Sequence, residues 1–184
     1  MTGWIIAGVA VALILIIFIV IYNGLVTLKN RADNGWANID TQLQRRYDLI
    51  PNLVETVKGY AAHEKDLFEK IALARSGMMN AGSVSEKAQA DNMLSGTLKS
   101  LFAVAEAYPQ LKANENFKEL QVELSNTENK ISFARQFYND TIAKYNMAIQ
   151  KFPKNIIAGM LGFKQRDYFK AESEEARKAP KVTF

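Results

Sequence analysis

Residues 4–22 form an unbroken apolar run, and no charged side chain precedes Lys29. Trp4 and Tyr22 stand at the two ends of this run, as aromatic residues do where membrane helices meet the lipid–water interface, and Phe18 lies within it. At about 1.5 Å of rise per residue, a helix of this length crosses the roughly 30 Å hydrocarbon core of a bilayer. The sequence therefore predicts a transmembrane helix.

Three alternatives to a permanent span fit the run less well. A cleavable signal peptide has a basic segment, an apolar core of about 7 to 15 residues and a small-residue cleavage site, whereas residues 1–3 are uncharged, the run is longer, and residues 22–26 offer no clear cleavage pattern. A lipid anchor through cysteine is excluded, because the chain has no Cys. A helix buried in a soluble protein is rarely apolar on every face over this length.

The basic residues predict the orientation of the span. Lys29, Arg31, Arg45 and Arg46 follow the run and none precedes it, so the positive-inside rule places the rest of the chain in the cytoplasm. The absence of cysteine is expected in a reducing compartment, and it is equally compatible with an envelope-facing domain that has no disulfides.

The rest of the chain is long enough for one domain with a core of its own. We expect an anchor over 1–28, a helical bundle over 29–169 and a flexible charged tail over 170–184.

The formal net charge is +4, and the basic excess falls after Phe152. That end could contact anionic lipid or an acidic partner, although interspersed acidic residues favour a solvated tail. The basic residues do not form a stripe with interleaved aromatic residues, so we predict no nucleic-acid partner.

Apolar residues after the run recur at steps of three and four, which predicts helices over about 29–76, 85–108, 116–152 and 155–169. Pro51 lies inside the first, where we expect a kink or local irregularity because the apolar stripe keeps its phase. Ser83 and Glu86 fit a capping box before the second helix, and Pro109 ends it.

The third of these helices has the most regular pattern, an alternation of three and four from Phe117 to Phe152. Such a seam is typical of coiled-coil-like packing, but its Thr127, Tyr138, Thr141 and Tyr145 favour an intramolecular bundle over a free zipper. The predicted fold class is all-α: an N-terminal transmembrane helix that continues into an elongated antiparallel three- to four-helix bundle.

A short apolar segment follows Pro153 and is too short to span a membrane. It either closes one end of the bundle or forms an interaction patch, which would be an oligomer contact or an interfacial surface beside Lys164, Arg166 and Lys170. The candidate patch residues are Ile156, Ile157, Met160, Leu161 and Phe163.

Motifs for catalysis, cofactors or metals are not evident in the sequence. The only histidine, His63, has no second His four residues on, and zinc catalysis needs about three protein ligands. We therefore predict no catalytic, cofactor-binding or metal-binding residues and no small-molecule substrate.

Polar residues beside the seam could form a partly buried network that fixes helix register, or a solvated flank. Both interpretations give these residues a structural role. The candidates are Arg46, Asp48, Glu106, Glu128, Arg135, Asn139 and Asn146.

Several motifs together resemble the bacterial LemA family over nearly the whole chain. They are Arg45–Val54 (RRYDLIPNLV), Glu106–Pro109 (EAYP), the Tyr-Asn pairs at 138–139 and 145–146, and Phe152–Asn155 (FPKN) followed by Ile157–Ala158. The resemblance implies a single-pass bacterial membrane protein with a helical bundle and without an established enzymatic activity. Genes of the family often neighbour a membrane metalloprotease of the HtpX type, which associates it with envelope quality control.

We therefore expect a membrane-anchored scaffold or protein-interaction protein in the bacterial cytoplasmic membrane. Its expected partners are the bilayer, through residues 4–22, and copies of itself or other membrane proteins. The alternative is a regulatory adaptor of a membrane protease. If the helical phase continues from the span to about Ser76, one helix on the order of 100 Å would join anchor and bundle.

Overall fold

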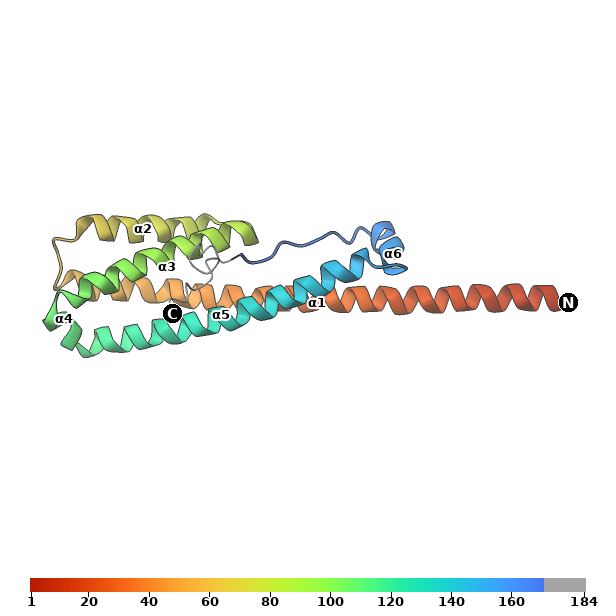
Figure 1. The fold of residues 1–184 in the computed structure, drawn as a ribbon, viewed down its shortest axis with the longest axis horizontal. Coiled ribbons are helices and arrows are strands. Elements are labelled where there is room, and N and C mark those ends of the chain that lie inside the picture. The colour runs from red at the N-terminus through yellow and green to blue at the C-terminus, as the bar shows by residue number, and fades with distance from the viewer. Residues whose placement is uncertain (171–184) are drawn as a thin grey trace, which may run out of the picture. The chain divides into compact units, whose positions relative to one another are not determined.

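The computed structural model describes residues 1–170, and every regular element among them is an α-helix (Figure 1). The expected all-α fold, with an apolar N-terminal helix that continues into an antiparallel bundle, is confirmed. The expected tail over 170–184 lies outside the described residues, apart from Lys170. The helices are α1 (Thr2–Lys58), α2 (Lys65–Asn80), α3 (Val84–Glu106), α4 (Pro109–Ala113), α5 (Glu115–Gln150) and α6 (Lys154–Met160).

Helix α1 has 57 residues and a length of about 86 Å, and it contains Pro51. The expectation that it extends to about residue 76 is wrong, because α1 ends at Lys58 and α2 begins at Lys65. The break begins at Gly59, a poor helix former. The apolar phase continues through the turn because Val57, Ala61 and Leu67 all face one core, so periodicity alone did not signal the break.

The described residues form two compact units that share α1 and α5. The first contains Met1–Asn38 and Arg135–Asp167, and the second contains Ile39–Ala134 and residues 168–170. The second unit is a bundle of the C-terminal part of α1, helices α2 and α3, and the N-terminal part of α5, with the short α4 at one end (Figure 1). Its core includes Ile50, Leu53, Ile71, Leu94, Leu98, Leu101, Phe117 and Leu124.

The capping box at the start of α3 is confirmed. The Ser83 hydroxyl accepts a hydrogen bond from the Glu86 amide at 3.2 Å, and the Glu86 carboxylate accepts one from the Ser83 amide at 3.0 Å. The Gly82 amide donates to the same carboxylate oxygen at 2.8 Å. Three backbone donors at this helix start are thereby satisfied, which anchors the loop after α2.

The seam of α5 is buried at the expected positions from Phe117 to Ala148 except Leu120 and Ala134, which are partly covered. Phe152, the last expected seam residue, is 79% exposed instead. The reason is that α5 ends at Gln150, two residues earlier, and the chain turns at Pro153 into α6. The aromatic ring of Phe152 therefore no longer follows the buried face of the helix.

The last helix is shorter than the expected 155–169, because a glycine ends it. Gly162 has a φ of +71°, the Phe163 amide donates to the Ala158 carbonyl at 2.9 Å, and the Gly162 amide donates to the Gly159 carbonyl at 3.4 Å. This pattern is a Schellman motif, which terminates a helix through a residue in the left-handed region. Beyond it, residues 163–170 have no regular secondary structure.

Candidate functional site

The N-terminal part of α1 exposes an apolar surface on every face. Residues 1–20 are all exposed, and this end of α1 extends without neighbouring segments (Figure 1). Among the described helices, α1 is the one long and apolar enough to cross a membrane. A surface of this kind is costly in water and matches the hydrocarbon core of a bilayer, so the helix fits a single-pass membrane protein. Trp4, Phe18 and Tyr22 are all exposed on it.

Packing against α1 begins at Ile21, near the end of the apolar run. Ile21 and Leu25 are buried in a small core that includes Tyr145 of α5 and Ile157 of α6. Tyr22 and Asn23, between the two buried α1 residues, remain exposed. From this level onward, α1 buries one stripe and leaves its other faces open, as an amphipathic helix does.

The candidate patch on α6 is divided by this packing. Ile157 is buried in the core with Ile21, and Phe163 is packed against the same core. Ile156, Met160 and Leu161 are exposed. Phe152, expected in the α5 seam, is exposed as well. Two of the five predicted residues therefore belong to internal packing. The other three lie on the surface, and so does Phe152.

Three side chains of α5 hold the segment that follows α6. The Tyr145 hydroxyl donates to the Lys164 carbonyl at 3.0 Å, and the Tyr138 hydroxyl donates to the Asp167 carbonyl at 3.0 Å. Asn146 pairs with the Arg166 backbone in both directions, at 2.9 Å each. Because residues 164–167 have no regular secondary structure, these side chains supply bonds that a helix or sheet would otherwise provide. We call residues 164–167 the strap.

The side chain of Arg166 connects the strap to α1. Its guanidinium donates to the Asp33 carboxylate at 2.5 Å and lies 5.7 Å from the centre of the Tyr145 ring. Burial raises the pKa of both Tyr138 and Tyr145, and the charge of Arg166 opposes this shift. Both phenols therefore stay protonated, and able to donate, to a higher pH than an ordinary tyrosine.

Arg46 forms the centre of a polar cluster in the second unit. Its guanidinium contacts the Asp91 carboxylate at 2.8 Å, the Ser95 hydroxyl at 2.9 Å and the Glu128 carboxylate at 3.0 Å. Arg46 and Asp91 are 4% and 0% exposed, whereas Glu128 is 49% exposed. The cluster thus joins α1, α3 and α5 through a buried ion pair with an exposed third partner.

The other predicted network residues lie elsewhere. Asp48 accepts a hydrogen bond from Gln44 of its own helix at 2.8 Å, and Glu106 pairs with Lys112 at the surface. Arg135, Asn139 and Asn146 belong to the first unit, whereas Arg46 and Glu128 belong to the second. Of the predicted set, the structure brings Arg46 and Glu128 into contact.

Sequence reasoning missed Asp91, the best-buried partner of Arg46. A signal was available, because Asp91 lies three residues before Leu94 and seven before Leu98, in phase with the apolar face of α3. A charged residue in a core stripe predicts a buried partner of opposite charge. The strap had no comparable signal, since its acceptors are backbone carbonyls.

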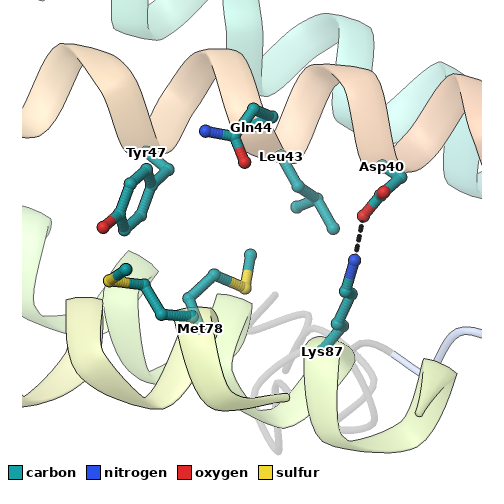
Figure 2. A pocket seen from close by; sticks show the side chains of 7 residues that line it. Asp40, Leu43, Gln44, Tyr47, Met78 and Lys87 are labelled. Carbon is teal, nitrogen blue, oxygen red and sulfur yellow. Dashed lines mark hydrogen bonds and ion pairs between the residues drawn. The ribbon is translucent and has the colours of Figure 1, made fainter. Parts of the chain in front are cut away.

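Clefts in the second unit are open to solvent, with volumes of about 230 to 520 Å³. Figure 2 shows one of about 230 Å³, where Leu43, Gln44 and Tyr47 of α1 face Met78 of α2, and Lys87 pairs with Asp40 at the edge. Ligand pockets usually bury most of the ligand, which clefts as open as these do not. His63 lies exposed in the turn between α1 and α2. Within residues 1–170, no group of three or more His, Cys, Asp or Glu is placed to hold a metal ion.

Comparison with known proteins relates the chain to one family. The profile of the LemA family matches residues 35–184, so the match begins after the apolar run. The magnetosome protein MamQ of Magnetospirillum gryphiswaldense is 29% identical over 174 residues, which cover 80% of this chain and 64% of that protein. Two MamQ proteins of Paramagnetospirillum magneticum are each 28% identical, over 88% of this chain and 68% of theirs.

A relative outside the magnetosome proteins shows the same extent of similarity. The protein LemA of Metamycoplasma hominis is 27% identical over 158 residues, which cover 83% of this chain and 70% of that protein. The chain spans slightly less than two thirds of the length of the Magnetospirillum relative. The profile match covers well over half of the chain, and the motifs from Arg45 to Asn155 lie inside it. The chain belongs to the LemA family.

Proposed function

We propose that this protein is a single-pass membrane protein that presents a non-catalytic helical bundle as a scaffold for other proteins. Residues 4–22 span the bacterial cytoplasmic membrane, and the bundle lies on the cytoplasmic side. The observation that carries the proposal is the uniform exposure of apolar side chains along residues 4–20 of α1. Lys29 and Arg31, which follow the span, support the cytoplasmic orientation.

The scaffold role is supported by the contacts and the surface of the bundle. Polar side chains within residues 1–170 make structural contacts, such as the cluster around Arg46 and the strap. Exposed apolar side chains such as Leu73, Val122 and Phe133 lie on the surfaces of α2 and α5. Exposed apolar side chains become protein contacts where they gather into a contiguous patch. We propose that copies of the chain associate with one another in the membrane.

The orientation is tested by protease accessibility. A tag at Phe184 in intact spheroplasts is expected to resist an added protease and to be cleaved after lysis. A periplasmic tag placed before Thr2 is the control, and it is expected to be cleaved in intact spheroplasts. Cleavage of the tag at Phe184 without lysis would refute the cytoplasmic placement.

Self-association is tested with single cysteines, because the chain has none of its own. Phe133→Cys, at a position that is 73% exposed, is expected to form a disulfide-linked or crosslinked dimer in membranes. Ile131→Cys, at a buried position, is the control. A strictly monomeric protein by light scattering and crosslinking would refute self-association, and recovery of a membrane protease with the monomer would favour the adaptor role.

A further inference from the structure

We propose that the exposed face of α6 is a second membrane contact, which inserts into the headgroup region of anionic lipid beside the transmembrane helix. Ile156 and Met160, four residues apart, lie on this face, and together with the flanking Phe152 and Leu161 they make up what we call the α6 patch. Phe152, Ile156, Met160 and Leu161 are 79%, 53%, 74% and 45% exposed. The inference rests on the proposed span, and it adds a lipid class and a set of residues to it.

The position of α6 on α1 supports a lipid partner. The buried side of α6, Ile157 and Ala158, packs in the same core as Ile21 and Leu25 of α1. Ile21 is in the last turn of the apolar run, so α6 is attached where the span leaves the hydrocarbon. Interfacial amphipathic helices bury their apolar face about 5–10 Å into the headgroup and acyl boundary, and α6 is attached to α1 at this level.

The charge around the α6 patch fits an anionic surface. Lys151 precedes it, Lys154 lies between its first two residues and Lys164 follows it, and no acidic residue lies between Asp140 and Asp167. The first unit has eight basic residues, at 29, 31, 135, 144, 151, 154, 164 and 166, and three acidic ones, at 33, 140 and 167. Its excess of five positive charges exceeds the +4 of the whole chain. Basic residues next to a span attract anionic lipid headgroups.

Internal contacts hold the patch in place before any lipid binds. The Schellman motif at Gly162 fixes the end of α6, and the Tyr145 and Asn146 side chains fix the strap that follows. The patch therefore loses little conformational freedom when it inserts. A wholly flexible segment would have to be ordered first.

Spin labels at single cysteines test the contact in the full chain. Met160→Cys places a label on the patch, and Met93→Cys, on α3 of the second unit and 60% exposed, is the matched control. Ile156→Cys provides a second patch position. The proteins are reconstituted in vesicles of equal parts phosphatidylcholine and phosphatidylglycerol. Power saturation with oxygen, which enriches in lipid, and a neutral nickel chelate, which stays in water, reports where each label lies.

The expected result is that oxygen collisions exceed nickel collisions for the labels at positions 160 and 156, with the reverse order at position 93. Nickel collisions that dominate at both patch positions would overturn the inference. Low collision rates with both reagents, which increase when protein is diluted in lipid, would also overturn it, because they indicate contact with a second copy. Lys154→Gln is expected to lower the equilibrium ratio of molecules with the patch in lipid to molecules with the patch in water about fivefold. An unchanged ratio would refute the role of charge.

A label introduced by Leu13→Cys, near the middle of the span, separates this inference from the proposed function. If the label at position 13 lies at the bilayer centre and the label at position 160 lies in water, the α6 contact fails and the span stands. If the label at position 13 is itself in water, the proposed membrane span fails.

Discussion

Replacing Asp91 with alanine is expected to destabilise the protein strongly, because it leaves the Arg46 guanidinium buried without its closest charged partner. Arg46 is only 4% exposed, and its remaining charged contact, Glu128, is half exposed. Removing one member of a buried pair costs about 3–5 kcal/mol, and the Glu128 and Ser95 contacts place this case at the lower end. At about 2–4 °C per kcal/mol, the expected loss in Tm is roughly 6–12 °C.

Thermal unfolding of the full chain in a mild detergent, followed by far-UV circular dichroism, measures this loss. Glu128→Gln is the matched control, because its exposed carboxylate contributes at most about 1 kcal/mol. The double variant Arg46→Met with Asp91→Leu is expected to recover most of the lost stability, since apolar pairs replace buried ion pairs at little cost. A loss of under about 1 kcal/mol for Asp91→Ala, or a double variant no more stable than Asp91→Ala alone, would refute the reasoning.

Three further substitutions test other contacts. Tyr145→Phe removes the hydroxyl that holds the Lys164 carbonyl, so we expect a loss of about 1 kcal/mol and faster amide hydrogen exchange in the strap. Burial raises the pKa of Tyr145 above its ordinary 10.0. The contribution of Tyr145 to the free energy of unfolding is therefore complete below pH 10.0 and is lost as the pH rises through the raised pKa. Denaturant titrations at alkaline pH should show that Tyr145→Phe loses less stability than the unchanged protein as the pH rises. Hydrogen bonds from the Gly82 and Ser83 backbone lower the pKa of Glu86 below its ordinary 4.5, so stability present above that pH is lost as pH falls through the lowered value. Glu86→Gln should flatten this acid dependence, and an unchanged profile would contradict the capping role. Gly96→Ala should stabilise α3 by about 1 kcal/mol in denaturant unfolding, because the added Cβ would have no atom within 4 Å beyond its chain neighbours and the backbone of its own helix. A loss of stability would contradict this.

Local signals in the sequence predicted several of the helix boundaries. The capping box at Ser83 and the seam of α5 correspond to features of the structure. Pro109, expected to end the second helix, lies just after the end of α3 at Glu106 and begins α4, a short helix that was not predicted. The break after Lys58 was not predicted, because residues on both sides of the turn face the same core and keep the same period. The seven-residue gap between Ala61 and Phe68, together with Gly59, was the available signal.

The polar residues in the α5 seam show how much of a site the sequence can predict. Thr127 and Thr141 donate to carbonyls of their own helix at 2.8 Å, whereas Tyr138 and Tyr145 donate to the strap. The sequence identified all four as unusual for a free zipper. It could not identify what the tyrosines bind, because backbone carbonyls carry no sequence signature and the two acceptors lie 29 and 19 residues beyond their donors.

Along α1, apolar side chains on every face give way to a single buried apolar stripe, and the hydrophobic effect accounts for both parts of the helix. Lipid tails and protein cores are both apolar, so apolar residues continue past the span at Leu25 and Leu28. What changes at Ile21 is the number of apolar faces: the helix is exposed and apolar all round before it, and after it Asn23 and Thr27 separate the buried positions. A helix leaves lipid where its polar faces begin, because those faces need water. If residues 4–22 span the membrane as proposed, the boundary lies at about Asn23, level with the core that attaches α6, and a label at Met160 reports on this boundary as well as on the α6 patch.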